Sequence, residues 1–83
     1  MYYTYILLSL KTSRFYIGHS GDLKNRLREH NSGESKATRA GMPWELVFKN
    51  EFPTRADAMR EEQKIKARGA ARYLEAVTEA QAD

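Results

Sequence analysis

Arg26 and His30 lie four residues apart, directly after the aromatic segment Tyr16-Ile17-Gly18. On a helix, Leu23 and Leu27 would form the buried stripe, and both polar side chains would lie at the edge of that stripe. A permanently charged arginine and a histidine that titrates near neutral pH could form the wall of a cleft there. The purely structural alternative is a histidine that binds the last helix carbonyls and an arginine whose stem covers the core.

The surrounding pattern predicts six elements, in the order strand, strand, helix, strand, helix, helix. Their approximate residue ranges are 3–8, 15–18, 20–32, 44–52, 55–69 and 70–80. Gly18 is expected to turn the chain out of the second strand. Ser20 is expected to cap the first helix, and Thr54 with Asp57 the second. The fold predicted for residues 1–83 is therefore a single α+β domain, in which helices flank a small three-stranded antiparallel sheet.

The third predicted strand shows an alternation of two residues. Trp44, Leu46 and Phe48 alternate with Glu45, Val47 and Lys49, so the first three side chains are expected to share one face. The preceding residues 33–43 are rich in Gly, Ser, Lys and Arg and are expected to form a loop.

The composition of the chain excludes several classes of protein. Its 83 residues can form one domain with a modest core, and the absence of cysteine excludes disulfide-linked partners, thiolate zinc sites and cysteine nucleophiles. The apolar start is too short for a membrane span or a signal peptide, so a cytoplasmic location with no membrane contact is expected. The formal charge of +3 permits a polyanionic partner, but it could equally serve solubility.

Several short motifs, taken in order, resemble the GIY-YIG nuclease family. Tyr16-Ile17-Gly18 follows Tyr5 by eleven residues, and Tyr3-Thr4-Tyr5 stands where Gly-Ile-Tyr would be, with only the tyrosine matching. Similar later blocks are Arg26 with His30, Thr38-Arg39, Pro43 with Leu46-Val47, and residues 60–66. The resemblance is to small stand-alone bacterial members and covers about residues 3–66. It leaves the alanine-rich segment 67–83, expected to be a C-terminal helix, outside the match.

This resemblance implies a metal-dependent endonuclease that hydrolyses phosphodiester bonds in DNA. Arg26 would bind the phosphoryl oxygens as negative charge develops on them. Tyr5 would accept a proton from the attacking water if nearby cations depress its pKa, and Tyr16 would position water or substrate. His30 would relay a proton or hold Tyr5 in place, and Gly18 would shape the site.

The resemblance also implies one Mg²⁺ or Mn²⁺ ion held by a helix glutamate. The family pattern selects Glu61, four residues before Ile65, whereas Glu62 is explained as an exposed pair with Lys66 one turn later. One carboxylate suffices because water and substrate phosphate can complete the coordination of such an ion.

A nucleic-acid partner, expected to be DNA, requires basic side chains around the site. Four residues are expected to contact phosphates without sequence preference: Lys24, Arg28, Lys36 and Arg39. Two other functions stay open, namely a non-catalytic nucleic-acid-binding module with a nuclease-like fold and a small interaction protein that uses the strand around Trp44. The sequence does not indicate the structure of the substrate or the oligomeric state.

Overall fold

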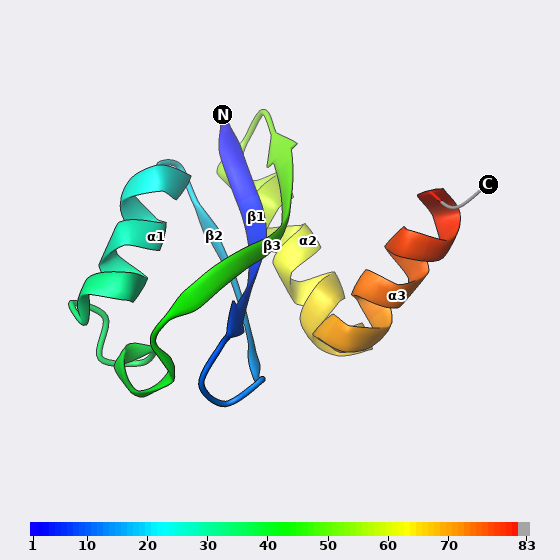
Figure 1. Cartoon of the computed structure of the whole chain (residues 1–83). Helices are drawn as coiled ribbons and strands as arrows, with labels where there is room; N and C mark the ends of the chain where they lie inside the picture. Colours follow the sequence, from blue (N-terminus) through cyan, green and yellow to red (C-terminus); the bar gives the residue numbers. More distant parts are fainter. Residues whose placement is uncertain (82–83) are drawn as a thin grey trace.

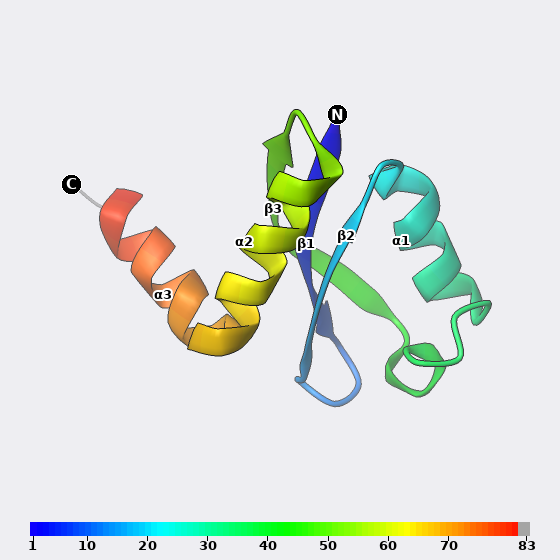
Figure 2. The ribbon, with the colours of Figure 1, turned by 180° about the vertical axis from the view of Figure 1, so that it is seen from behind.

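A three-stranded sheet lies between two helical layers (Figures 1 and 2). The computed structural model describes the backbone of residues 1–81 and the side chains of residues 1–78. The elements are β1 (Tyr2–Ser9), β2 (Phe15–Ser20), α1 (Leu23–Ser32), the short 3-10 helix η1 (Arg39–Gly41), β3 (Trp44–Phe52), α2 (Arg55–Arg68) and α3 (Ala70–Gln81). Figure 1 shows α1 on one side of the sheet and α2 with α3 on the other. The predicted element order and α+β fold are confirmed.

The central strand of the sheet is β1, which pairs antiparallel with β2 on one side and β3 on the other. It is central because its apolar run is buried on both faces, from Thr4 to Leu7. Successive side chains of a strand point to opposite faces. Tyr5 and Leu7 therefore face α1, whereas Thr4 and Ile6 face α2.

Each face of the sheet has its own core. The α1 side buries Tyr5, Leu7 and Trp44, and five partly buried side chains pack on them: Tyr16, Leu23, Leu27, Met42 and Leu46. The α2 side buries Ile6, Ile65 and Ala70, and the side chains packed on them are Ile17, Val47, Phe48, Tyr73 and Leu74. Leu23 and Leu27 thus form the buried stripe of α1 that the sequence predicts.

A β-bulge in β3 breaks the alternation expected for that strand. Leu7 pairs with Leu46, but Ile6 pairs with Phe48, so Val47 is an extra residue between them. Such an insertion shifts every later side chain to the other face. The prediction that Phe48 shares a face with Leu46 is therefore wrong, since Phe48 packs on the α2 side and Lys49 lies opposite Tyr5.

The predicted ends of the elements are confirmed in part. Gly33, at φ 85°, ends α1, and the hydroxyl of Thr54 caps α2 by accepting a hydrogen bond from the amide of Asp57. The cap of α1 is Asp22 and not Ser20, whose hydroxyl instead accepts a hydrogen bond from the Asp22 amide. Within residues 1–81, every helix is too short or too polar to cross a bilayer.

Candidate active site

A buried hydrogen-bonded chain joins β1, α1 and the loop before η1. Tyr5 Oη lies 3.0 Å from His30 Nε2, and His30 Nδ1 lies 2.7 Å from Thr38 Oγ1. These three side chains are only 1–2% exposed. The Thr38 carbonyl in turn accepts a hydrogen bond of 2.8 Å from the Trp44 indole. The imidazole of His30 is therefore held at both nitrogens, and the alternative that it binds the last helix carbonyls is wrong.

Burial controls the charge states of this Tyr5–His30–Thr38 chain. Burial and then the nearby charge of Arg26 lower the pKa of His30, so its imidazole is neutral at physiological pH. Burial, followed by the effect of Tyr16, raises the pKa of Tyr5 well above its ordinary value, and the charge of Arg26 offsets only part of this. The condition for Tyr5 to accept a proton, a lowered pKa, is therefore not met in the free protein. Tyr5 is a neutral phenol that holds His30 in place.

Gly18 leaves space for the hydroxyl of Tyr5. It lies inside β2, opposite Tyr5, so the turn expected at this glycine is wrong. A Cβ atom at this position would come within 2.7 Å of Tyr5 Oη and 3.2 Å of Tyr16 Cε2. Any side chain here would displace one of the two tyrosines, so Gly18 shapes the site through its missing side chain.

Tyr16 and Arg26 lie on the accessible side of the chain. Tyr16 is half-buried, with its ring centroid 4.9 Å from that of His30 and 6.3 Å from that of Trp44. Arg26 is exposed and lies 3.5 Å from a carboxylate oxygen of Glu29, a surface pair that is readily exchanged for another anion. After burial, its charge is a second cause of the lowered pKa of His30, and it opposes the rise in the pKa of Tyr5.

Both candidate glutamates lie on α2, which covers the opposite face of the sheet from Tyr5. The Glu61 carboxylate accepts a hydrogen bond of 2.6 Å from the hydroxyl of Tyr73 in α3 and lies 3.7 Å from Lys64. Glu61 therefore does not lie beside the Tyr5–His30–Thr38 chain, although its expected role as the metal ligand of that site would require it. The spacing on the helix could not reveal this, because Tyr73 comes from a different helix.

Glu62 lies at the edge of the sheet, next to the residue that follows Gly18. It is only 9% exposed, and its carboxylate binds His19 Nδ1 at 2.6 Å and Lys66 Nζ at 2.5 Å. Burial opposes ionisation, but the hydrogen bonds from Lys66 and His19 hold the pKa of Glu62 below its ordinary value. Lys66 pairs with it as expected, but the expectation of an exposed pair is wrong. Beyond burial, the charge of Glu62 also helps to raise the pKa of Tyr5.

One known family matches most of the chain. A family model described as the GIY-YIG catalytic domain matches residues 1–74. The chain belongs to the GIY-YIG catalytic domain family.

The chain is similar to UPF0213 proteins from several bacteria. UPF0213 proteins from Bacillus pumilus and Streptococcus pneumoniae are 41% and 37% identical over 66 and 65 residues, which make up 78% and 77% of this chain. The matched segments span 66% and 65% of those proteins, just under two thirds of their length. A UPF0213 protein from Staphylococcus saprophyticus is 30% identical over 94% of this chain and 95% of its own.

A solved GIY-YIG neighbour supports the fold. The solution NMR structure of a UPF0213 protein from Bacillus halodurans is 34% identical to this chain and has a TM-score of 0.56. The similarity covers 94% of this chain and 84% of that one. Family membership and fold therefore support a nuclease-type function, whereas the names of these relatives state no activity.

The side chains of this GIY-YIG domain fit a divalent ion only with help from a substrate. Among the described residues there is no cluster of three His, Cys, Asp or Glu side chains that could hold a metal. Glu62 is the carboxylate at the β2 edge, and the half-exposed side chain of Lys66 can leave it at small cost. Mg²⁺ often retains several waters and takes phosphate oxygens as ligands, so one protein carboxylate is compatible with such a site.

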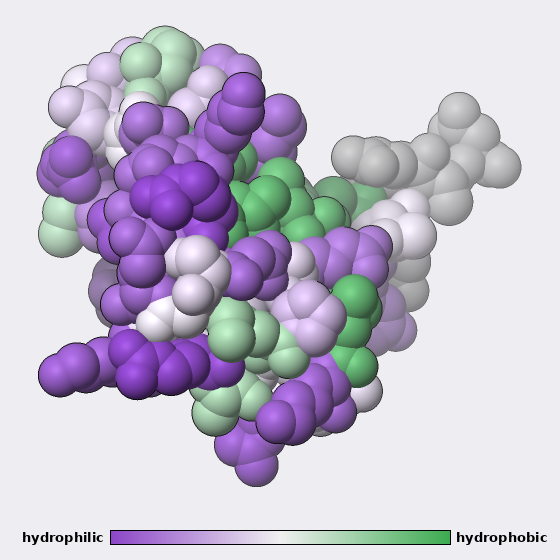
Figure 3. Space-filling view, turned by 60° about the vertical axis from the view of Figure 1, so that its left-hand side comes forward, coloured by the Kyte–Doolittle hydropathy of each residue, from purple (hydrophilic) through white to green (hydrophobic). Residues whose placement is uncertain are grey.

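The four basic residues expected to bind phosphates are all exposed, but two of them already donate hydrogen bonds to other groups of the chain. Arg28 donates a 2.8 Å hydrogen bond to Glu34, and Arg39 donates one of the same length to the carbonyl of Gly33. Lys24 and Lys36 form no ion pair within the described part of the chain. Figure 3 shows that hydrophilic side chains cover most of the face on that side of the molecule.

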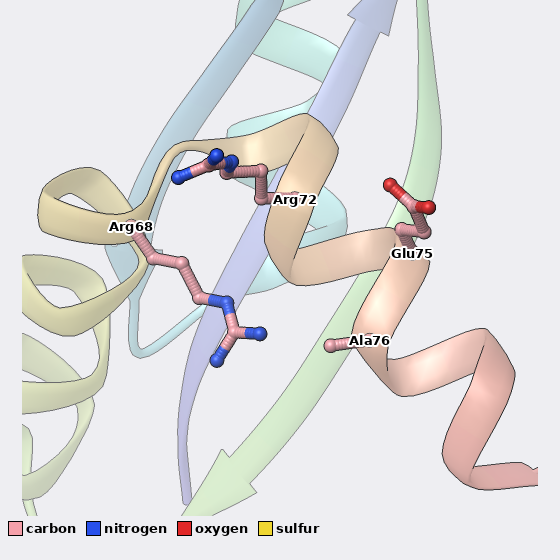
Figure 4. A pocket seen from close by; sticks show the side chains of 4 residues that line it. All are labelled: Arg68, Arg72, Glu75 and Ala76. Carbon is pink, nitrogen blue, oxygen red and sulfur yellow. The ribbon is translucent and has the colours of Figure 1, made fainter.

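A basic hollow lies where α2 meets α3, in addition to the basic residues described above, and it was not predicted. Figure 4 shows the guanidinium groups of Arg68 and Arg72 in this hollow, which Glu75 and Ala76 also line. These arginines belong to the opposite helical layer from the Tyr5–His30–Thr38 chain. Neither His19 nor Thr38 was predicted to contact another site residue, although His19 directly follows the Tyr-Ile-Gly motif and its position could have pointed to it.

Proposed function

We propose that this GIY-YIG domain is a metal-dependent endonuclease that hydrolyses phosphodiester bonds in DNA. The observation that carries the proposal is the buried Tyr5–His30–Thr38 chain with Tyr16 and Arg26 at its accessible side. Three buried side chains whose polar groups are hydrogen-bonded to one another, beside an exposed arginine, form a rigid wall for an anionic substrate. Family membership supports the same class of reaction.

In the proposed reaction a water attacks phosphorus and releases a proton to solvent, the bond between phosphorus and the leaving oxygen breaks, and the leaving oxygen takes up a proton from solvent. Arg26 binds a phosphoryl oxygen and stabilises the charge that develops there. Tyr16 has the more accessible of the two phenols and orients the water or the phosphate. His30 holds Tyr5, and Tyr5 fixes the position of the imidazole beneath the Tyr16 ring.

Glu62 is the residue that we propose would hold Mg²⁺ or Mn²⁺. It replaces Glu61 in this role because Glu62 lies beside β2 at the residue next to Gly18, whereas Glu61 is bound to Tyr73. A bound divalent ion would supply stabilisation of negative charge on the phosphate and the leaving oxygen. The hydrogen bond from His19 would fix the orientation of the carboxylate.

The second candidate is a non-catalytic nucleic-acid-binding module. It is favoured by the state of Glu62, since His19 and Lys66 already occupy both carboxylate oxygens, and by the protonated state of Tyr5. A binding module needs the basic surface but neither a free carboxylate nor a metal. The two candidates therefore differ in cleavage and agree in binding.

A cleavage assay on wild-type protein and Arg26→Ala separates the two. We expect wild-type protein to cut plasmid, branched or single-stranded DNA with Mn²⁺ and to stop when a chelator is added. Arg26→Ala should lower the rate on the order of a hundredfold or more, because one contact to the developing charge is lost. Arg72→Ala is the matched control, because it removes the same charge from the helical layer opposite the Tyr5–His30–Thr38 chain and should stay within about threefold of wild type. Equal rates for Arg26→Ala and wild type, with both folded by circular dichroism, would remove the assignment.

A further inference from the structure

A hollow of about 560 Å³ opens beside Tyr16, away from the Tyr5 hydroxyl. The hairpin between β1 and β2 and the loop that leads into β3 form its walls. The side chains that matter here are Arg14, Phe15, Tyr16, Ala37, Ala40 and Trp44. We propose that this hollow binds the base of one unpaired nucleotide next to the bond that is cut, an inference that rests on the proposed nuclease function.

The hollow adjoins the candidate active site. Tyr16 and Thr38 both line it, and both also contact His30, through the ring at 4.9 Å and the hydroxyl at 2.7 Å. A phosphate bound at Arg26 and Tyr16 would therefore place the neighbouring nucleotide at the mouth of the hollow. The site and the hollow share their wall, so one strand could occupy both.

The lining of the hollow suits a base better than a charged group. Phe15, Tyr16 and Trp44 contribute aromatic surface, and Ala37 and Ala40 leave room beside it. Trp44 is mostly buried and its indole N–H is already bound to a backbone carbonyl, so it forms the floor of the hollow without a free donor, and Phe15 and Tyr16 supply most of the accessible aromatic area. Such a surface stacks with any base and gives little sequence preference.

Only an unpaired nucleotide can present a base in this way. In a duplex, neighbouring bases cover both faces and the partner strand covers the pairing edge, whereas single strands and flaps expose them. Arg14 is exposed on the rim of the hollow, where its cation can contact the phosphate that follows the inserted base. The hollow therefore selects strands that have at least one nucleotide outside a duplex.

The test scans a single-stranded DNA oligonucleotide of defined sequence with one abasic position at a time. In wild-type protein, we expect one abasic position beside the cleavage point to lower cleavage by about tenfold or more, with the other positions near neutral. Ala40→Phe should fill the hollow, reduce cleavage of the intact oligonucleotide to a similar degree, and make the protein insensitive to that abasic position. Ala67→Phe is the matched control, because it adds the same ring at an exposed site on α2 and should keep both rate and abasic sensitivity.

The outcomes separate this inference from the proposed function. Cleavage that is insensitive to abasic substitution at every position overturns the hollow and leaves the nuclease function standing. Unchanged abasic sensitivity in Ala40→Phe, with the variant folded by circular dichroism, also overturns the hollow. Absence of any cleavage by wild-type protein, with any of the divalent ions, removes the proposed function and this inference with it.

Discussion

The two faces of the sheet bury different kinds of side chain, although both start from neighbouring residues of β1. On the α1 side, Tyr5 leads into a chain of buried hydroxyl and imidazole groups. On the α2 side, the next residue, Ile6, packs with Ile65 and Ala70 in an apolar core. Among the described residues, no buried side-chain nitrogen or oxygen lacks a hydrogen-bond partner, so the polar groups of this face are all satisfied.

This difference separates the parts of the domain that stabilise it from the part that holds the site. Apolar burial stabilises a fold without fixing the position of any one group, because it is roughly proportional to area. A buried hydrogen-bonded chain adds little net stability but fixes each polar atom, and removing one member leaves its partner unpaired. The α1 side therefore fixes the positions of the polar side chains of the candidate site. Glu62 contacts the β2 edge of the sheet from the other helical layer.

The largest expected effect comes from the two glutamates of α2. Glu62→Gln removes the negative charge at the β2 edge, so metal-dependent cleavage should fall on the order of a hundredfold or more. Glu61→Gln keeps a hydrogen bond to Tyr73 and should stay within about threefold of wild type. Cleavage rates against Mn²⁺ concentration, with DNA binding measured in parallel, would check this. A loss of metal-dependent cleavage in Glu61→Gln but not in Glu62→Gln would identify Glu61 as the metal ligand and contradict the proposal for Glu62.

Next come paired substitutions on the two faces. Tyr5→Phe leaves the buried Nε2 of His30 without a partner and should lower the free energy of unfolding by about 1–3 kcal/mol. Ile65→Val removes one buried methyl group and should lower it by about 0.5–1.5 kcal/mol. The two variants should differ most in cleavage rate. Tyr5→Phe should lower the rate by more than about tenfold, whereas Ile65→Val should leave it almost unchanged. Denaturant titration and cleavage rates on the same samples would show whether the two faces separate in this way.

A smaller effect concerns pH. Because the pKa of His30 is lowered by burial and by Arg26, the unfolded chain binds that proton first as the pH falls. The stability contributed by neutral His30 is therefore complete above the unfolded pKa of about 6.5 and is lost as the pH falls through the lower folded pKa. His30→Gln should remove this slope between about pH 7 and 5. Denaturant midpoints for both proteins across that range would test it, and parallel slopes would contradict a buried neutral imidazole.

Much of the fold follows from local signals in the sequence. The apolar run of β1, the glycine that ends α1 and the Thr54 cap of α2 each depend on residues near one another along the chain, and all were predicted correctly. The β-bulge at Val47 was not, because it depends on how β3 pairs with β1 and has no local signature. Gly18 was identified correctly but for the wrong reason, since its role depends on the ring of Tyr5 from another strand.

The site shows the same division between local and long-range information. Spacing on one helix placed Arg26 at the surface beside the core, where the structure has it. It did not show that His30 is fully buried, because the partners of that imidazole lie 25 and 8 residues away. The surroundings of Glu61 and Glu62 could not be predicted for the same reason, since Tyr73 and His19 contact them from other elements.

The smallest expected effect tests which face meets the nucleic acid. Lys24→Ala with Lys36→Ala removes two positive charges from the α1 side, and Arg68→Ala with Arg72→Ala removes two from the hollow between α2 and α3. Each phosphate contact contributes about 0.9 to the slope of log affinity against log salt on duplex DNA, or about 0.7 on a single strand. The lysine pair should therefore lower that slope by up to about 1.8 on duplex DNA. The arginine pair should leave it unchanged, because those side chains lie in the layer that carries no part of the Tyr5–His30–Thr38 chain.

Fluorescence anisotropy at several salt concentrations measures both slopes. A lower slope only for the arginine pair would place the nucleic acid on the α2–α3 side, and a wild-type affinity that does not change with salt would remove nucleic acid as the partner.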